Sequence, residues 1–127
     1  MIRGIESVLL FSKDPGKLAG FYREKVGLKV ELVGEYGEKN EEILFQLKMG
    51  KTNLLYILHH SKIHGNTKEP ERVMINYEVD NIEKEFDRLI KNKVKKIQDI
   101  YHIEDYGKIA TFRDLDGNFF QIVQVRA

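Results

Sequence analysis

The feature that most constrains the fold of this chain is an internal repeat, because helix starts, aromatic positions and turns recur at a spacing of 67 residues. The positions that match at this spacing are Ser7 and Met74, Asp14 and Asn81, Phe45 and Phe112, and Gly50 and Gly117. Few residues are identical between the halves, so the evidence for the repeat is the common register of these features. This register predicts two copies of one module.

The first half has the pattern of a strand, a helix and three more strands. Residues 4–12 are short, apolar and β-branched, as in a buried strand. Asp14 and Pro15 predict a helix start, because a carboxylate caps free backbone N–H groups and proline lacks a donor that this position does not need. Gly27 favours a left-handed end to that helix. Three strands are predicted at residues 28–33, 42–49 and 52–59, with turns at 34–40 and 50–51.

The second half repeats this order after a polar linker at about residues 61–70. Alternating apolar residues at 73–79 predict a strand, and Asn81 is the predicted cap of the next helix. Asp116-Gly117 is a strong signal for a tight hairpin turn between the last two strands. The last three strands are predicted at residues 95–101, 107–113 and 118–125.

Composition narrows the class of protein. The chain has 127 residues, of which 42% are hydrophobic, enough to fill a core. Its apolar runs are far shorter than the ~18 residues that cross a bilayer. Together with the lack of a signal-peptide pattern, this predicts an unprocessed cytoplasmic protein with no membrane partner. A net charge of +1 argues against nucleic acid, and the absence of cysteine excludes disulfides and thiolate chemistry.

Both ends of the chain resemble a known family. Near the start of the chain, the similar segments are residues 5–14, Phe21-Tyr22 and residues 26–28. Near its end, they are Tyr106-Gly107 and residues 110–121. These segments resemble the vicinal oxygen chelate superfamily, which includes glyoxalase I, the extradiol dioxygenases and the bleomycin resistance proteins. Where that family usually has proline in the closing hairpin, this chain has Leu115.

The resemblance implies an α+β fold with two tandem β-α-β-β-β modules, whose mixed, curved sheets surround a shared cavity. It implies one domain over residues 1–127, with a first module at about 1–60 and a second at about 71–127. Members of the family often complete the cavity in a homodimer, so a homodimer is expected here.

Enzymes of this family generally hold a divalent metal in the cavity. The resemblance places the ligand positions at Ser7, at Leu54 or Tyr56, at Met74 and at Gln121. None of these is histidine, aspartate or glutamate, the oxygen and nitrogen donors that catalytic metals prefer. We therefore expect no metal and no cofactor, and the sequence identifies no catalytic residue.

Inward-facing positions on the first and fourth strands of each module are predicted to line the cavity. The predicted lining is Ser7, Leu9, Phe11, Leu54, Tyr56, Met74, Asn76, Phe112 and Gln121. This largely apolar set with a few neutral hydrogen-bonding groups is typical of a small-molecule pocket.

Two functions are compatible with that lining. The first is a metal-free binding protein that sequesters or senses an amphipathic or aromatic small molecule. The alternative is a glyoxalase-like lyase or isomerase with a degenerate or non-standard metal site. A histidine or carboxylate in the cavity would favour the enzyme, and Glu78 and His60 are the residues to check.

Overall fold

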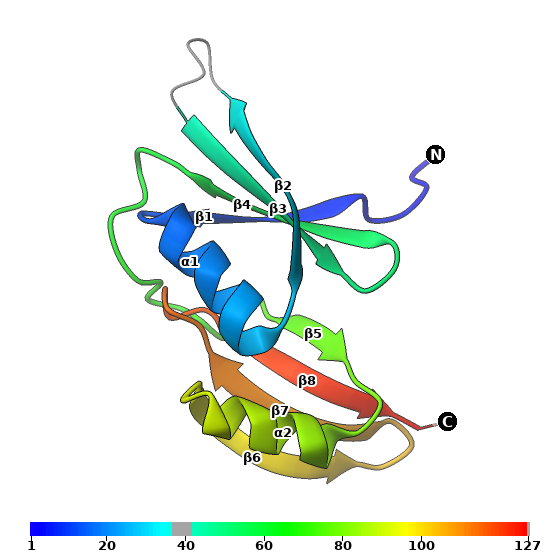
Figure 1. The fold of residues 1–127 in the computed structure, drawn as a ribbon. Coiled ribbons are helices and arrows are strands. Elements are labelled where there is room, and N and C mark those ends of the chain that lie inside the picture. Colours follow the sequence, from blue (N-terminus) through cyan, green and yellow to red (C-terminus); the bar gives the residue numbers. More distant parts are fainter. Residues whose placement is uncertain (37–41, 127) are drawn as a thin grey trace. The chain divides into compact units, whose positions relative to one another are not determined.

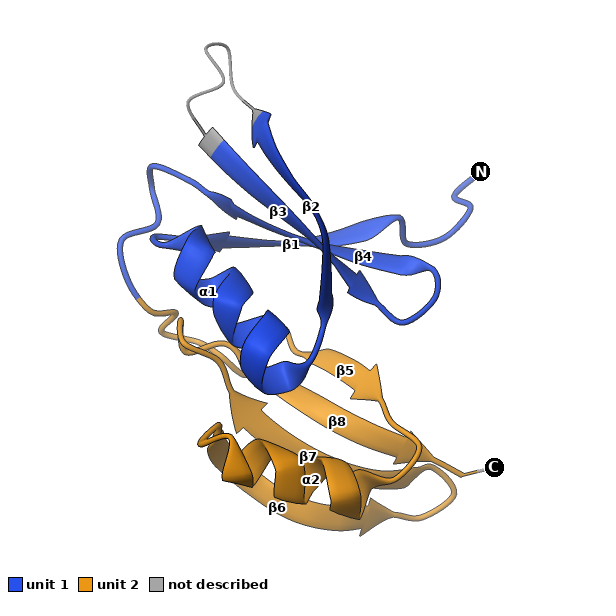
Figure 2. Ribbon diagram, in the orientation of Figure 1, with its two compact units in different colours: residues 1–65 blue, residues 66–127 orange. Residues whose placement is uncertain are grey.

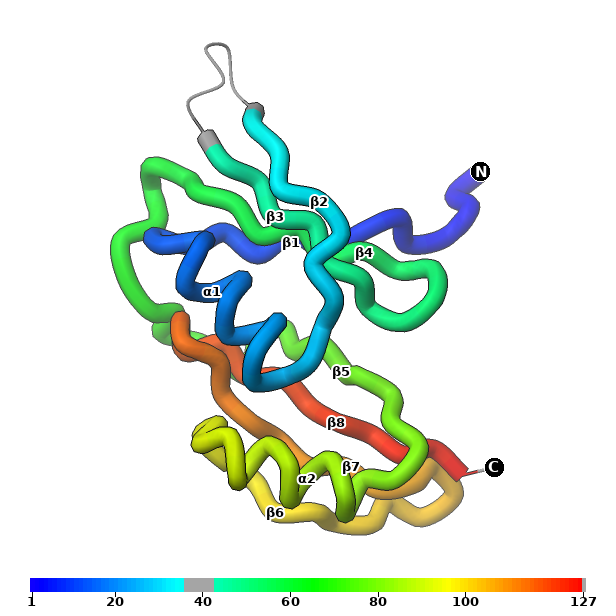
Figure 3. Tube along the Cα trace, in the orientation of Figure 1, coloured from blue at the N-terminus to red at the C-terminus, as the bar shows by residue number. Residues whose placement is uncertain are grey.

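The computed structural model describes residues 1–36 and 42–126. These residues form two compact units, 1–65 and 66–127 (Figure 2). The boundary falls inside the interval predicted as a linker. Each unit contains one four-stranded mixed sheet and one helical segment, in the order strand, helix and three strands (Figures 1 and 3). The α+β class and the repeated modules predicted from the sequence are thus confirmed.

The first unit has its sheet in the order β1-β4-β3-β2. Its first and last strands, β1 and β4, run parallel, and the other neighbours are antiparallel. The elements are β1 (Ser7–Ser12), α1 (Pro15–Phe21), a π-helical turn η1 (Tyr22–Val26), β2 (Lys29–Tyr36), β3 (Glu42–Met49) and β4 (Asn53–His59). The turn predicted at residues 34–40 lies partly in β2, and its remainder is outside the described residues.

The helical segment of the first unit begins and ends where the sequence predicts. The carboxylate of Asp14 accepts a hydrogen bond from the backbone N–H of Lys17 at 3.2 Å. Gly27 ends the segment with a φ of 100°, in the left-handed region. Its N–H reaches back five residues to the carbonyl of Tyr22 at 2.8 Å, so the last turn is wider than an α-helical one.

The second unit has its sheet in the equivalent order, β5-β8-β7-β6, with β5 parallel to β8. The elements are β5 (Ile75–Glu78), α2 (Ile82–Lys91), β6 (Lys95–Ile103), β7 (Gly107–Arg113) and β8 (Phe119–Val125). Asn81 caps α2, because its side-chain oxygen accepts from the N–H of Lys84 at 3.1 Å. The N–H of Ile82 is bound by the side chain of Gln124 at 2.8 Å, which ties the helix start to β8.

The hairpin predicted at Asp116-Gly117 joins β7 and β8. Asp114 and Asn118 pair across it, and Gly117 takes the left-handed conformation with a φ of 83°. The buried carboxylate of Asp114 accepts hydrogen bonds from the N–H groups of Asp116 and Asn118 and from the Asn118 amide, at 2.9–3.0 Å. The loop therefore contains three residues, a common hairpin length with glycine in this position.

One face of each sheet forms the core beneath its own helix. In the first unit α1 packs on β3 and β4, where Leu47 and Leu55 are fully buried. In the second unit α2 packs on β6, β7 and β8, above the buried side chains of Phe112, Phe120 and Ile122. Since strand side chains alternate between faces, the residues between these core positions point to the face without a helix, here called the open face.

No helix in the described part of the chain is long and apolar enough to span a membrane.

Candidate functional site

The open face of the second sheet carries a row of neutral hydrogen-bonding side chains. Asn76 of β5 pairs with Gln121 of β8, which pairs with Thr111 of β7. The side-chain amide of Gln121 donates a hydrogen bond to the Thr111 hydroxyl at 2.9 Å. This bond leaves the amide oxygen of Gln121 and the hydroxyl hydrogen of Thr111 for other partners.

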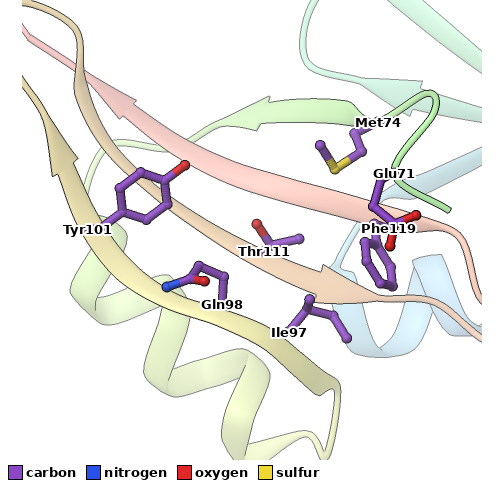
Figure 4. Close-up of a pocket in the computed structure, with 7 residues that line it drawn as sticks. All are labelled: Glu71, Met74, Ile97, Gln98, Tyr101, Thr111 and Phe119. Carbon is purple, nitrogen blue, oxygen red and sulfur yellow. The ribbon is translucent and has the colours of Figure 1, made fainter.

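Beside this row lies a cavity of about 390 Å³ that belongs entirely to the second unit. Figure 4 shows Thr111 and Gln98 between Tyr101 on one side and Glu71, Met74 and Phe119 on the other. The lining residues are Glu71, Met74, Ile97, Gln98, Tyr101, Thr111 and Phe119. A volume of this size suits a small organic molecule, and the mixture of aromatic, apolar and neutral polar groups is typical of such a site.

The structure distributes the residues predicted to line the cavity over both units. Met74 lines the cavity, and Asn76 and Gln121 occupy the same open face of the second sheet. The other open-face residues of that prediction lie in the first unit, with Ser7 paired to Leu54 and Leu9 paired to Tyr56, and with Phe11 farther along β1.

Phe112 does not lie on the open face, which corrects its predicted place in the lining. Its side chain is fully buried under α2, with its ring centroid 5.4 Å from that of Phe86. It also stacks on Phe120 of β8 at 6.1 Å. The neighbouring residue Thr111 takes the cavity position instead, because adjacent strand residues point to opposite faces.

Apart from Met74, none of the residues that line this cavity was predicted from the sequence. Ile97, Gln98 and Tyr101 come from β6, an edge strand with two register shifts, so its inward residues do not follow a simple alternation. Glu71 lies in the segment before β5, where no periodic pattern exists. Phe119 begins β8, and only the hairpin register identifies its face.

Neither His60 nor Glu78, the two candidates named from the sequence, is among the residues that line this cavity. Nδ1 of His60 accepts from the N–H of Lys62 at 3.1 Å, and the imidazole packs edge-on against Phe11 at 5.4 Å. Glu78 lines a second cavity of about 470 Å³ in the second unit, together with His102.

Charges around the second cavity are partly paired. Lys108 binds Glu83 of α2 at 2.7 Å, and this hydrogen bond lowers the pKa of the Glu83 carboxyl. Arg126 binds Asp105 at 3.2 Å. The second cavity is therefore lined by charged side chains as well as by apolar ones such as Val79 and Val125.

A buried phenol lies on the helix side of the second sheet and takes no part in the cavity. Burial raises the pKa of Tyr77, and the negative charge of Asp114 adds to the effect. The ring packs edge-on against Phe120 at 6.0 Å. The half-buried side chain of Tyr77 is therefore neutral, with its hydroxyl shielded from solvent.

The register of the two sheets defines which first-unit residue corresponds to Gln121. Leu9 and Asn76 are 67 positions apart, but their partners Tyr56 and Gln121 are 65 apart. The counterpart of Gln121 is thus Tyr56, and Leu54 corresponds to Phe119. The spacing of 67 residues consequently fails in the hairpins, although the order of elements repeats.

The side chains at the ligand positions do not fit a divalent metal. Ser7, Tyr56, Met74 and Gln121 offer a hydroxyl, a phenol, a thioether and an amide, whereas catalytic sites use imidazole, thiolate and carboxylate. The Gln121 amide nitrogen is a donor to Thr111. Among residues 1–36 and 42–126, no group of three or more histidine, aspartate or glutamate side chains could hold a metal ion.

Comparison with known proteins places the chain in a family. The model of the Glyoxalase/Bleomycin resistance protein/Dioxygenase superfamily matches residues 4–122. None of the curated proteins matches by sequence.

Solved structures share the fold at low identity. TnmS3, an antibiotic binding protein from Streptomyces sp. CB03234, has a TM-score of 0.77 and 20% identity, over 98% of each chain. A glyoxalase family protein from Enterococcus faecalis has a TM-score of 0.71 and 22% identity, over 97% of this chain and 98% of that one. The fosfomycin resistance protein FosX from Listeria monocytogenes has a TM-score of 0.73 and 13% identity, over 99% of this chain and 96% of that one. Since the family model spans nearly the whole sequence, the chain belongs to the Glyoxalase/Bleomycin resistance protein/Dioxygenase superfamily.

Proposed function

We propose that this protein binds an amphipathic or aromatic small molecule without a metal, and so sequesters or senses it. The observation that carries the proposal is the cavity of about 390 Å³ on the open face of the second sheet. Its apolar and aromatic side chains would contact the ligand, and Thr111 with Gln98 would orient it by neutral hydrogen bonds. An antibiotic binding protein and a fosfomycin resistance protein share this fold, which supports a ligand-binding role.

The resemblance also implies ligand-contacting residues in the first unit. They are Ser7, Leu9, Phe11, Leu54 and Tyr56, on the open face of its own sheet. We also propose, on the same ground, a single domain that acts as a homodimer in the cytoplasm. Light scattering after size-exclusion chromatography tests the dimer, and a monomer at micromolar concentration would contradict it.

The first test is the melting temperature of chelator-treated protein with zinc, nickel, cobalt or manganese. Binding at a hundred times the dissociation constant adds about 2.7 kcal/mol to the free energy of unfolding, so a specific metal would be visible. We expect no shift. A shift that Gln121→Ala abolishes would contradict the metal-free proposal, because it would assign a ligand role to that amide.

One observation keeps the lyase or isomerase as a second candidate. Glu71 is a carboxylate in the cavity lining, and a carboxylate can act as a general base. It is exposed, and the lining contains no histidine or second carboxylate to work with it. Binding is therefore the better supported function. A ligand recovered chemically unchanged after prolonged incubation would support it, whereas turnover lost in Glu71→Gln would support the enzyme.

A further inference from the structure

Glu71 is the only charged residue that lines the cavity, and its carboxylate has no ion partner within the described part of the chain. Its acidic neighbour Glu69 differs, because it pairs with Arg72 at 3.6 Å and does not line the cavity. A negative charge therefore stands at the cavity without a cation supplied by nearby side chains.

Two basic side chains of β6 and β7 are directed toward other groups. Lys96 on β6 pairs with Asp99 at 2.5 Å. Arg113 pairs with Phe119 across β7 and β8, but its guanidinium reaches toward Gly117, where an added Cβ would lie 3.5 Å from Nη2. Neither side chain forms an ion pair with Glu71 among the residues that the structure describes.

The rest of the lining suits the flat, apolar part of a cation. Phe119 and Met74 lie on the same side of the cavity as Glu71, and Tyr101 lies on the other side of Thr111 (Figure 4). Aromatic faces attract cations through their quadrupole, and a thioether makes favourable contacts with aromatic rings. A carboxylate beside aromatic side chains is consistent with a ligand that combines a ring system with a positive charge.

We propose that the cavity selects aromatic ligands that carry a positive charge, with Glu71 as the residue that determines this selectivity. The inference rests on the proposed binding function, and it goes further by naming the ligand class. Glu71 is exposed, so the selectivity should be modest and should weaken as salt screens the charge.

Three dyes with one ring system and different charges test this selectivity. Near neutral pH, aminoacridine is a cation, acridine is uncharged and acridine carboxylate is an anion. Fluorescence titration of the full chain should give the order cation, neutral, anion, with steps of about fivefold, as for exposed charge pairs. Glu71→Gln should remove the preference, and Glu69→Gln should keep it.

The possible outcomes separate the two proposals. Equal affinity for the three dyes, or a preference that survives in Glu71→Gln, would overturn the charge selectivity and leave the binding function supported. Failure of all three dyes to bind would overturn the aromatic-ligand function and the selectivity together. Unchanged melting temperatures of both variants would confirm that the substitutions act on the ligand and not on folding.

Discussion

The two units share one topology but differ in the cross-strand row at the middle of the open face. In the first unit the row is Leu9, Tyr56 and Gln46, and the amide of Gln46 binds Glu31 of β2 at 3.4 Å. In the second unit the row is Asn76, Gln121 and Thr111. Both rows lie on the open faces, opposite the side chains that pack under the helices.

The same difference extends along the faces. Leu9 and Phe11 in the first unit remain 48% and 39% exposed, so its open face presents apolar surface. In the second unit the open face carries the hydrogen-bonded amide of Gln121 and hydroxyl of Thr111 beside a cavity. Repetition of a module therefore preserves the buried face, and chemical specificity is located on the other face.

The largest expected effect concerns glycines in the two sheets. Gly107 has a φ of 148°, and an added Cβ would overlap the carbonyl oxygen of Gln124 on the neighbouring strand. Gly107→Ala should cost more than about 3 kcal/mol, because the backbone itself would have to move. Gly34→Ala in the first unit is the matched control, since nothing lies within 4 Å of its added Cβ. Urea unfolding measures both, and equal stability of the two variants would contradict the description of β7 and β8.

The next effect compares two aspartates that differ in burial and in the number of hydrogen bonds that they accept. Asp114 is buried and accepts three hydrogen bonds, so Asp114→Asn places an amide donor against the donors of Asn118 and should cost about 2 kcal/mol. Asp14 is exposed and accepts one cap bond from Lys17. Asp14→Asn should be nearly neutral, because asparagine caps a helix equally well. Thermal unfolding would refute this contrast if both variants lost the same stability.

A smaller effect distinguishes two adjacent residues on opposite faces of β7. Phe112→Leu should lower the free energy of unfolding by about 1 kcal/mol and leave the affinity for aminoacridine unchanged, because the ring lies under α2. Thr111→Val should instead weaken dye binding, since it removes a hydroxyl from the cavity. Titration calorimetry with both variants tests this contrast. If Phe112→Leu stayed folded but bound the dye more weakly, Phe112 would have to be counted among the residues that line the cavity.

The smallest effect is a pH dependence of an exposed pair. The hydrogen bond from Lys108 lowers the pKa of Glu83 from its ordinary value of 4.5. A lowered pKa in the folded state means that this contribution to stability is present above pH 4.5 and disappears as the pH falls through the lowered value. An NMR titration of the Glu83 carboxyl should show its pKa rise in Lys108→Met. No change would show that the pair is not formed in solution.

The sequence was sufficient to predict the element order, because local signals control it. Asp14, Asn81 and Gly27 act through bonds and dihedral angles within a few residues, and the structure has each in its predicted role. The face that a strand residue occupies, and the residue that it pairs with, depend instead on the length of the hairpin loop. A two-residue turn at Asp116-Gly117 would place Phe112 opposite Gln121, whereas the observed three-residue loop places Thr111 there. A slip of one residue exchanges the faces of a strand, so the side chain of Asp114, which shapes the loop, decides which residue reaches the cavity.

Glu71 could not be predicted as part of the site for a different reason. It lies in an irregular segment, where neither helical nor strand periodicity assigns a direction to a side chain. Only the three-dimensional arrangement brings it beside Met74 and Phe119.

The parallel pairing of first and last strands has a consequence for the order of folding during synthesis. β2, β3 and β4 follow one another as antiparallel neighbours, so they can pair as soon as each is made, whereas β1 must wait for β4. Closing the long loop between β1 and β4 carries an entropic cost. The addition of β1, the first strand to be synthesised, is therefore expected to be the slow step in forming this sheet. All four strands of the first sheet have been synthesised once the chain reaches His59, before β5 is made. The two sheets can therefore close one after the other rather than together.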